Sequence, residues 1–264
     1  MNFCVENISL ISLQTGALVF TRCLGMICFV PVFSGIEVSK LTRFLLAFLL
    51  TILVTPSLLL NEVFASDVVA LSSTPLLFVV SLFKEAAWGS VIGLTLKIFF
   101  EGVNFAGETI AKIGGISVAG SFDHLLGEET SSISRLLFWI ALSTFVLVRG
   151  CELFIDGFLN VFFTVPPTGS TELGSVIECL GIVLTASFSL GLKIAAPVIL
   201  STLSVYIFIG VAGRVFPQMN LTTIGFSCNS LLTLIVLSLG ISSCCLCFQD
   251  ELVKILERVF IVDG

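Results

Sequence analysis

The chain has few side chains that could carry out acid–base or metal chemistry. His124 is its only histidine, and it follows Asp123 in a glycine-rich stretch. A single histidine excludes a metal site built on two histidines and any mechanism that needs two imidazoles. None of the H-E-x-x-H, G-x-x-x-x-G-K-[ST] and G-x-S-x-G motifs occurs in the sequence. We therefore expect a protein without enzymatic activity, cofactor or metal ion.

Several charged residues lie inside apolar stretches, where an ionised group costs about 2.5–3.5 kcal/mol on membrane-insertion scales. They are Glu85, Lys97, Glu101 and Glu108. One interpretation is that they line a path for protons or ions. The other is that Lys97 and Glu101, which are four residues apart, neutralise each other on one helix face. We favour this structural pair.

The nine cysteines lie almost entirely within apolar runs. A free cysteine behaves there as a small buried hydrophobic residue. The cluster Cys244-Cys245-x-Cys247 lacks a second Cys or His pair at zinc spacing. We interpret the cysteines as packing or lipid-facing residues, not as a disulfide framework or a metal site.

Two long runs without Asp, Glu, Lys or Arg dominate the second half of the chain. They are Ile194–Gly213 and Val215–Gln249, and only Arg214 separates them. A helix of ~20 apolar residues can cross a bilayer, whereas a helix of a soluble protein needs a polar face. A lone buried Arg must find a carboxylate or several carbonyls. We therefore expect Arg214 in a structural contact at a helix bend or a subunit interface.

The composition supports an all-α, polytopic membrane protein. Hydrophobic residues make up 56% of the chain, charged residues 11%, and the mean hydropathy is +1.15. The 264 residues leave room for about six or seven hydrophobic segments in a single domain spanning 1–264. The net charge of −6 argues against a nucleic-acid partner. The C-terminal tail, 250–264, is amphipathic, because Leu252, Ile255, Leu256 and Val259 share one helical face.

Charges interrupt several segments and make them marginal as bilayer spans. The interrupting residues are Arg22, Lys97, Arg149 and Lys193. Either these charges are paired within a membrane protein, or neighbouring subunits cover the apolar faces in a larger assembly. The sequence leaves both possibilities open.

The segment Glu101–Ser134 differs from the rest because it combines charged residues with six glycines. We interpret it as a helix that loses regularity and becomes a flexible loop, which we place at 113–127. The rival interpretation is a solvated connector. Upstream, Gly89-x-x-x-Gly93 is a spacing that favours close helix packing.

The order of the remaining motifs is informative. Pro197 is followed by Gly210-x-x-x-Arg214-x-x-Pro217-Gln218-x-Asn220 and then by Ile224-Gly225-Phe226. The first half agrees at Arg22, Gly25, Pro31, Arg43, Pro56, Glu85, Gly89, Gly93, Gly107, Glu108, Gly115 and Asp123. Over nearly its whole length the chain resembles the FliR/SctT family, the R subunit of the type III secretion export gate. It departs from the family pattern at His124, where proline is usual, and at Arg149-Gly150-Cys151, where Gly-Gly-His or Asn-Gly-His is frequent.

The resemblance implies a fold of kinked helical hairpins within a multi-subunit, helical export gate in the bacterial inner membrane, at the flagellar basal body or the injectisome base. It also implies P and Q subunits and the B-type switch subunit as partners, together with membrane lipid. Unfolded secreted proteins would be transient substrates.

In such gates the R subunit contributes a loop that plugs the closed pore. The matching positions are Ile113, Gly114, Gly115, Ile116, Ser117, Val118, Ala119, Gly120, Ser121 and Phe122. Candidates for structural or assembly roles are Arg22, Arg43, Glu85, Gly89, Gly93, Glu108, Pro197, Arg214, Pro217, Gln218 and Asn220.

The leading alternative is a secondary transporter or an ion channel. A transporter would more usually show two similar halves with broken helices, and no convincing repeat is present. Within the resemblance, the flagellar branch is favoured over the injectisome branch. The sequence Gln218-Met219-Asn220…Ile224-Gly225-Phe226 and the absence of a long tail support this choice.

Overall fold

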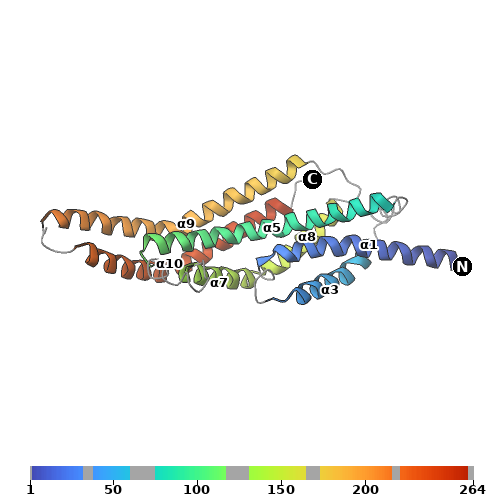
Figure 1. The fold of residues 1–264 in the computed structure, drawn as a ribbon, viewed down its shortest axis with the longest axis horizontal. Coiled ribbons are helices and arrows are strands. Elements are labelled where there is room, and N and C mark those ends of the chain that lie inside the picture. Colours follow the sequence, from blue (N-terminus) through green and yellow to red (C-terminus); the bar gives the residue numbers. More distant parts are fainter. Residues whose placement is uncertain are drawn as a thin grey trace. The chain divides into compact units, whose positions relative to one another are not determined.

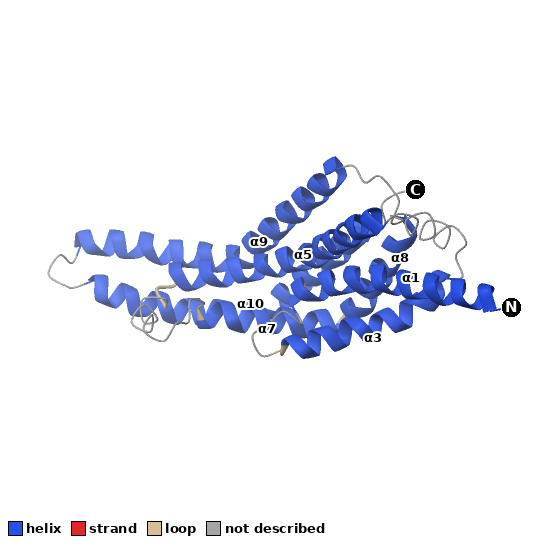
Figure 2. Ribbon diagram, turned by 45° about the vertical axis from the view of Figure 1, so that its right-hand side comes forward, coloured by secondary structure: helices blue, strands red, loops and turns tan. Residues whose placement is uncertain are grey.

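The computed structural model describes residues 2–31, 38–59, 75–116, 131–164, 173–215 and 221–260. Every regular element in these ranges is an α-helix (Figures 1 and 2). The helices are α1 (Asn2–Phe29), α3 (Lys40–Leu59), α5 (Pro75–Ile113), α7 (Ser132–Leu147), α8 (Gly150–Thr164), α9 (Leu173–Val215) and α10 (Leu221–Phe260). The prediction of an all-α fold is confirmed.

The helices are long and apolar, as the charge-free runs predict. Five of them could cross a membrane by length and composition: Ser12–Phe29, Lys40–Leu59, Pro75–Ile113, Val176–Val215 and Gly225–Leu256. α7 and α8 together make a sixth candidate if they are counted as one broken span. The described helices are therefore those of a polytopic membrane protein.

A local break separates α7 from α8. Ser131 begins α7 as its N-cap, because its side chain accepts a hydrogen bond from the Ser134 N–H. At the other end the N–H of Val148 donates to the Thr144 carbonyl at 3.0 Å. Arg149 then has a φ of 58°, a left-handed conformation that few residues other than glycine adopt. The apolar stretch after Ser131 therefore forms two short helices.

The chain divides into two compact units. The first contains Met1–Ile98, Glu152–Ile182 and Leu256–Gly264, and the second contains Phe99–Cys151 and Val183–Ile255. The single domain spanning 1–264 stays a prediction.

In the first unit α1 packs against α3. The rings of Phe20 and Phe44 meet edge to face there, with centroids 5.2 Å apart. The opposite face of α3 is apolar and exposed, including Phe48, Leu49 and Leu53. Such a face needs lipid or another subunit to cover it.

The core of the second unit is a phenylalanine cluster. The ring of Phe100 lies 5.7, 5.6 and 5.4 Å from the rings of Phe138, Phe145 and Phe248, respectively. Edge-to-face aromatic pairs at these distances contribute beyond their buried area. The cluster joins α5, α7 and α10.

The described part of the C-terminal tail, 250–260, is the end of α10 and not a separate element; residues 261–264 lie outside the described residues. Leu252, Ile255 and Leu256 on its apolar face are buried, in agreement with the amphipathic pattern. On the polar face Glu251 Oε1 accepts a hydrogen bond from Lys193 Nζ of α9 at 2.6 Å. The tail is thus held on both faces.

Candidate functional site

A buried ion pair lies in the first unit, between Arg22 of α1 and Glu85 of α5. The side chains are 0% and 2% exposed. Arg22 Nη2 donates to Glu85 Oε1 at 3.0 Å, and Nε pairs with Oε2, so the contact is bidentate. Arg22 Nη1 reaches the Val161 carbonyl of α8 at 3.4 Å. The guanidinium carbon also lies 4.3 Å from the centre of the Phe162 ring, a distance at which cation–π attraction is significant.

Three glycines bring α1 and α5 into close contact beside this pair. A Cβ added to Gly93 would lie 3.0 Å from the Cβ of Phe29, and one added to Gly25 would lie 3.0 Å from the Ser90 nitrogen. A Cβ added to Gly89 would lie 2.8 Å from the carbonyl carbon of Arg22. No side chain fits between the two backbones at these positions. The spacing Gly89-x-x-x-Gly93 therefore does lie at a close helix crossing.

The first unit thus brings together four residues that the sequence singled out, namely Arg22, Glu85, Gly89 and Gly93. Because Glu85 is fully engaged by Arg22, its geometry is that of a structural group. A role of these residues in assembly stays a prediction.

The C-terminal end of α5 lies in the second unit and begins the glycine-rich segment. The N–H of Ile116 donates to the Ala111 carbonyl at 3.0 Å, and that of Gly115 donates to the Lys112 carbonyl at 3.2 Å. Gly115 has a φ of +76°. These features form a Schellman motif, the commonest ordered helix ending that uses glycine. The helix therefore stays regular through Ile113, the residue at which we placed the start of the loop.

Side chains from α9 and α10 hold this end. Asn229 Nδ2 donates to the Ile113 carbonyl at 2.8 Å, and Tyr206 Oη donates to the same carbonyl at 3.2 Å. Ser230 Oγ donates to the Gly114 carbonyl at 3.0 Å. A Cβ on Gly114 would lie 2.7 Å from Thr233 Oγ1, so α10 packs directly on the backbone. The four described plug candidates, Ile113–Ile116, are anchored; Ser117–Phe122 lie outside the described residues.

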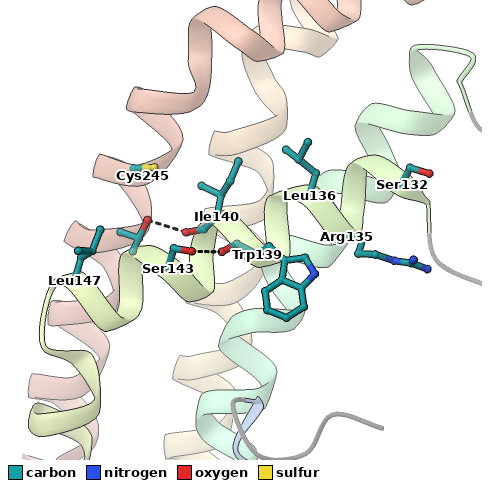
Figure 3. Close-up of a pocket in the computed structure, with 9 residues that line it drawn as sticks. Ser132, Arg135, Leu136, Trp139, Ile140, Ser143, Leu147 and Cys245 are labelled. Carbon is teal, nitrogen blue, oxygen red and sulfur yellow. Dashed lines mark hydrogen bonds between the residues drawn. The ribbon is translucent and has the colours of Figure 1, made fainter. Parts of the chain in front are cut away.

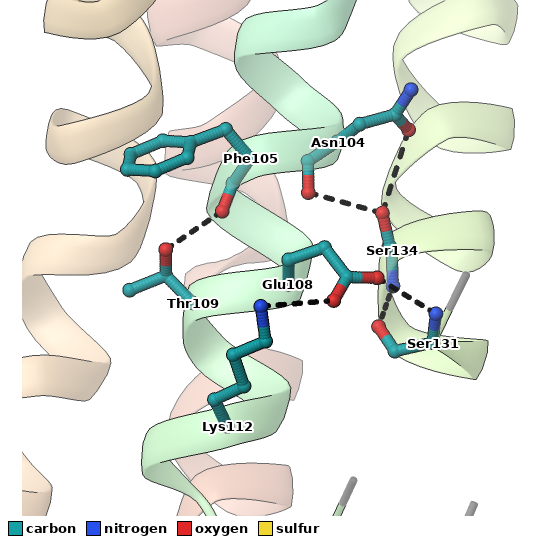
Figure 4. Close-up of polar contacts among 7 residues, drawn as sticks. All are labelled: Asn104, Phe105, Glu108, Thr109, Lys112, Ser131 and Ser134. Atoms are coloured by element: carbon teal, nitrogen blue, oxygen red, sulfur yellow. Dashed lines mark hydrogen bonds and ion pairs between the residues drawn. The ribbon is translucent and has the colours of Figure 1, made fainter. Parts of the chain in front are cut away.

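The far end of the glycine-rich segment is anchored by Glu108 (Figure 4). Its Oε1 accepts the backbone N–H of Ser131 at 2.8 Å, and its Oε2 lies 3.7 Å from Lys112 Nζ. In a capping box, a Glu within the helix accepts a hydrogen bond from the backbone N–H of the N-cap residue. For α7 the N-cap residue is Ser131, and the acceptor is Glu108 of a different helix, α5. Ser134 Oγ adds a bond to the Asn104 carbonyl at 3.0 Å.

An open groove of about 690 Å³ runs along α7 in the same unit (Figure 3). Trp139 is 56% exposed there, and Ser132 and Arg135 lie at the start of the helix. The remaining lining residues are Leu136, Ile140, Ser143, Thr144, Leu147 and Cys245. This apolar surface is another that lipid or a second subunit would have to cover.

The other candidates are dispersed. Arg43 is half-buried in the first turn of α3, and Pro197 lies inside α9. Pro197 has no N–H to donate to the Lys193 carbonyl, so this helical hydrogen bond is missing within α9. Pro217, Gln218 and Asn220 lie outside the described residues.

Arg214 is exposed in the last turn of α9, where a cation suits the helix dipole. Its contact at a helix bend or a subunit interface stays a prediction. One expectation is corrected. The favoured Lys97–Glu101 pair is wrong for the described residues. Lys97 lies over the Phe29 ring, 6.0 Å from its centre, and Glu101 accepts a hydrogen bond from Asn104 at 3.2 Å.

The sequence reasoning missed Tyr206, Asn229 and Ser230. One signal was available. Asn229 is an amide side chain in a long charge-free run, and a buried amide must find partners. Lys193 with Glu251 was missed as well, because the two residues are 58 positions apart.

Apolar helices of spanning length, a buried ion pair and glycine-mediated packing define a helical membrane protein whose polar side chains join and anchor helices. Among the described residues, no three His, Cys, Asp or Glu side chains are grouped closely enough to hold a metal ion. The family model described as "Bacterial export proteins, family 1" matches residues 13–255. The chain belongs to this family.

Curated relatives match this chain over most of their length. The chain is 27% identical over 225 residues to "Flagellar biosynthetic protein FliR" of Pectobacterium carotovorum, covering 84% of this chain and 81% of the relative. The protein of that name from Caulobacter vibrioides is 24% identical over 243 residues, covering 91% and 94%. The Bacillus subtilis protein is 25% identical over 232 residues, covering 83% of each. The chain is therefore a non-enzymatic export protein of the flagellar or type III secretion apparatus.

Proposed function

We propose that the chain is a core subunit of the export gate and helps to form and seal the pore through which unfolded flagellar proteins are secreted. The observation that carries the proposal is the anchoring of both ends of the glycine-rich segment. Asn229 and Ser230 hold its beginning, and Glu108 holds Ser131 at its end. A seal that yields to an unfolded chain needs small residues between firm supports.

The proposed partners are the P and Q subunits of the gate and the B-type switch subunit, in the bacterial inner membrane. Exposed apolar faces on α3 and α7 support an assembly of this kind, because they need covering. The flagellar system is favoured over the injectisome because the matched relatives carry the flagellar name.

A direct test replaces Ser117–Phe122 with a Gly/Ser linker of the same length and measures the conductance of the membrane to small ions. At matched abundance of the complex, loss of a seal should raise the conductance. A control replacement of the same length in another connection, at 165–170, should leave it unchanged. If conductance is unchanged in both variants, the segment is a connector and the sealing role is wrong.

A secondary transporter or ion channel is distinguished by purification. A gate subunit should be recovered in a stoichiometric complex with P and Q subunits, with one copy of this chain. A stable homo-oligomer that moves a solute without those subunits would contradict the gate assignment.

A further inference from the structure

Polar side chains of α9 and α10 donate hydrogen bonds to the backbone carbonyls at the C-terminal end of α5. A helix leaves its last four carbonyls without partners inside the helix. The Ala111 and Lys112 carbonyls accept the N–H groups of Ile116 and Gly115. The Schellman motif provides no donor for the next two carbonyls, those of Ile113 and Gly114. Side chains of α9 and α10 donate hydrogen bonds to them instead.

The donors form one connected group. Asn229 Nδ2 donates both to the Ile113 carbonyl at 2.8 Å and to Tyr206 Oη at 3.2 Å. Ser230, the next residue of α10, serves the Gly114 carbonyl. Asn229 is 2% exposed, so water does not readily replace it. We call Tyr206, Asn229 and Ser230 the latch.

Two atoms indicate that the latched arrangement is not fully satisfied. The Oδ1 atom of Asn229 and the Oγ1 atom of Thr233, one turn further along α10, are buried without a hydrogen-bond partner within the described residues. A buried polar atom without a partner destabilises the state that contains it. These two atoms therefore lower the net stability of the latched arrangement.

We propose that Asn229 is a positioning residue that, with Tyr206 and Ser230, keeps Ile113–Ile116 docked on α9 and α10, and that this docking keeps the pore closed to small ions. The link to the pore rests on the proposed function. The docking itself does not, because it concerns residues whose contacts the structure describes.

The variants are chosen within α9 and α10 and are studied in the assembled export complex. Ser230→Ala and Tyr206→Phe each remove one hydroxyl from the latch, and Asn229→Leu removes its central amide at similar size. Ser238→Ala is the matched control, because within the described residues the exposed Ser238 hydroxyl bonds only its own helix, at the Ile235 carbonyl. Ser230→Thr keeps the hydroxyl and should behave as the unchanged chain.

Hydrogen exchange at the amides of Gly115 and Ile116 reads the docking directly. Loss of one ordinary hydrogen bond should speed this exchange about fivefold in Ser230→Ala. Tyr206→Phe and Asn229→Leu each lose two hydrogen bonds and should speed it about twentyfold. Thr233→Val removes an unpartnered hydroxyl at nearly constant shape and should slow the exchange. Unchanged exchange in Asn229→Leu would overturn the latch.

Membrane conductance, measured at matched abundance of the complex, reads the consequence. It should rise in the same order, with Asn229→Leu above Ser230→Ala and with Ser238→Ala unchanged. Another outcome would also contradict this inference: the latch variants speed up hydrogen exchange but leave the conductance unchanged, whereas the Ser117–Phe122 replacement raises the conductance. In that case the latch does not control the seal. If the replacement does not leak, the proposed sealing function fails, whatever the exchange shows.

Discussion

The guanidinium of Arg22 forms a buried, bidentate ion pair with the carboxylate of Glu85, and this pair joins α1 to α5. Arg22 also contacts α8 through the Val161 carbonyl and the Phe162 ring. Three helices therefore depend on one charged side chain.

Removing one member of this pair should be far more harmful than removing both. Glu85→Ala leaves a buried guanidinium without its counter-charge, which typically costs about 3–5 kcal/mol. The double variant Arg22→Met with Glu85→Leu should recover much of that loss. Thermal unfolding and the level of the chain in the membrane measure the effect. Lys97→Met, an exposed charge on the same helix, is the control, and equal loss in the single and double variants would contradict the pair's role.

Gly93→Ala should disrupt the α1–α5 crossing, because the new methyl group would lie 3.0 Å from the Phe29 Cβ. We expect a loss of about 1–3 kcal/mol, as for other overpacked sites. Gly16→Ala in α1 is the matched control, since nothing lies within 4 Å of its added Cβ. That change should be neutral or should stabilise by about 0.5–1 kcal/mol. Equal stability of the two variants, measured by thermal unfolding, would show that the crossing tolerates a side chain.

Glu108→Ala should loosen the start of α7 by removing the acceptor for the Ser131 N–H. The expected loss is about 1 kcal/mol, as for an N-cap bond, and Glu108→Gln should retain most of it because an amide oxygen can still accept. Faster hydrogen exchange at the Ser131 and Ser134 amides is the measurement. Glu101→Ala removes a carboxylate whose hydrogen bond comes from its own helix. If it produces the same change as Glu108→Ala, the capping role is wrong.

Arg214→Ala should reduce recovery of the complex while changing the chain's own stability by less than about 1 kcal/mol. The reason is that Arg214 is exposed at the end of α9, where the helix dipole favours a cation. Co-purification with the partner subunits tests the first part and thermal unfolding the second. Arg258→Ala, an exposed cation in the last turn of α10, is the control. Normal recovery and secretion with Arg214→Ala would remove Arg214 from the interface.

The helices could be predicted from the sequence because apolar runs of spanning length have few alternatives. The family motifs likewise identified Arg22, Glu85, Gly89 and Gly93. Their mutual contact was not predicted, because Arg22 and Glu85 are 63 positions apart and no local pattern encodes that pairing. The Lys97–Glu101 prediction failed for the complementary reason. Spacing on one helix favoured it, but Phe29 and Asn104 offered each charge another partner.

The latch was missed because its three side chains bond backbone carbonyls. Tyr206, Asn229 and Ser230 contact Ile113 and Gly114 through atoms that every residue has. The identities of Ile113 and Gly114 therefore contain no signal for these bonds.

The 63-residue separation of Arg22 and Glu85 also has a consequence for biosynthesis. At about 5–20 residues per second, Arg22 leaves the ribosome roughly 3–13 s before Glu85 does. During that interval Arg22, if α1 spans the bilayer, would lack the carboxylate that later accompanies it, which costs about 2.5–3.5 kcal/mol at the bilayer centre on insertion scales. α1 should therefore settle only when α5 arrives, and the two helices should enter the bilayer as a pair.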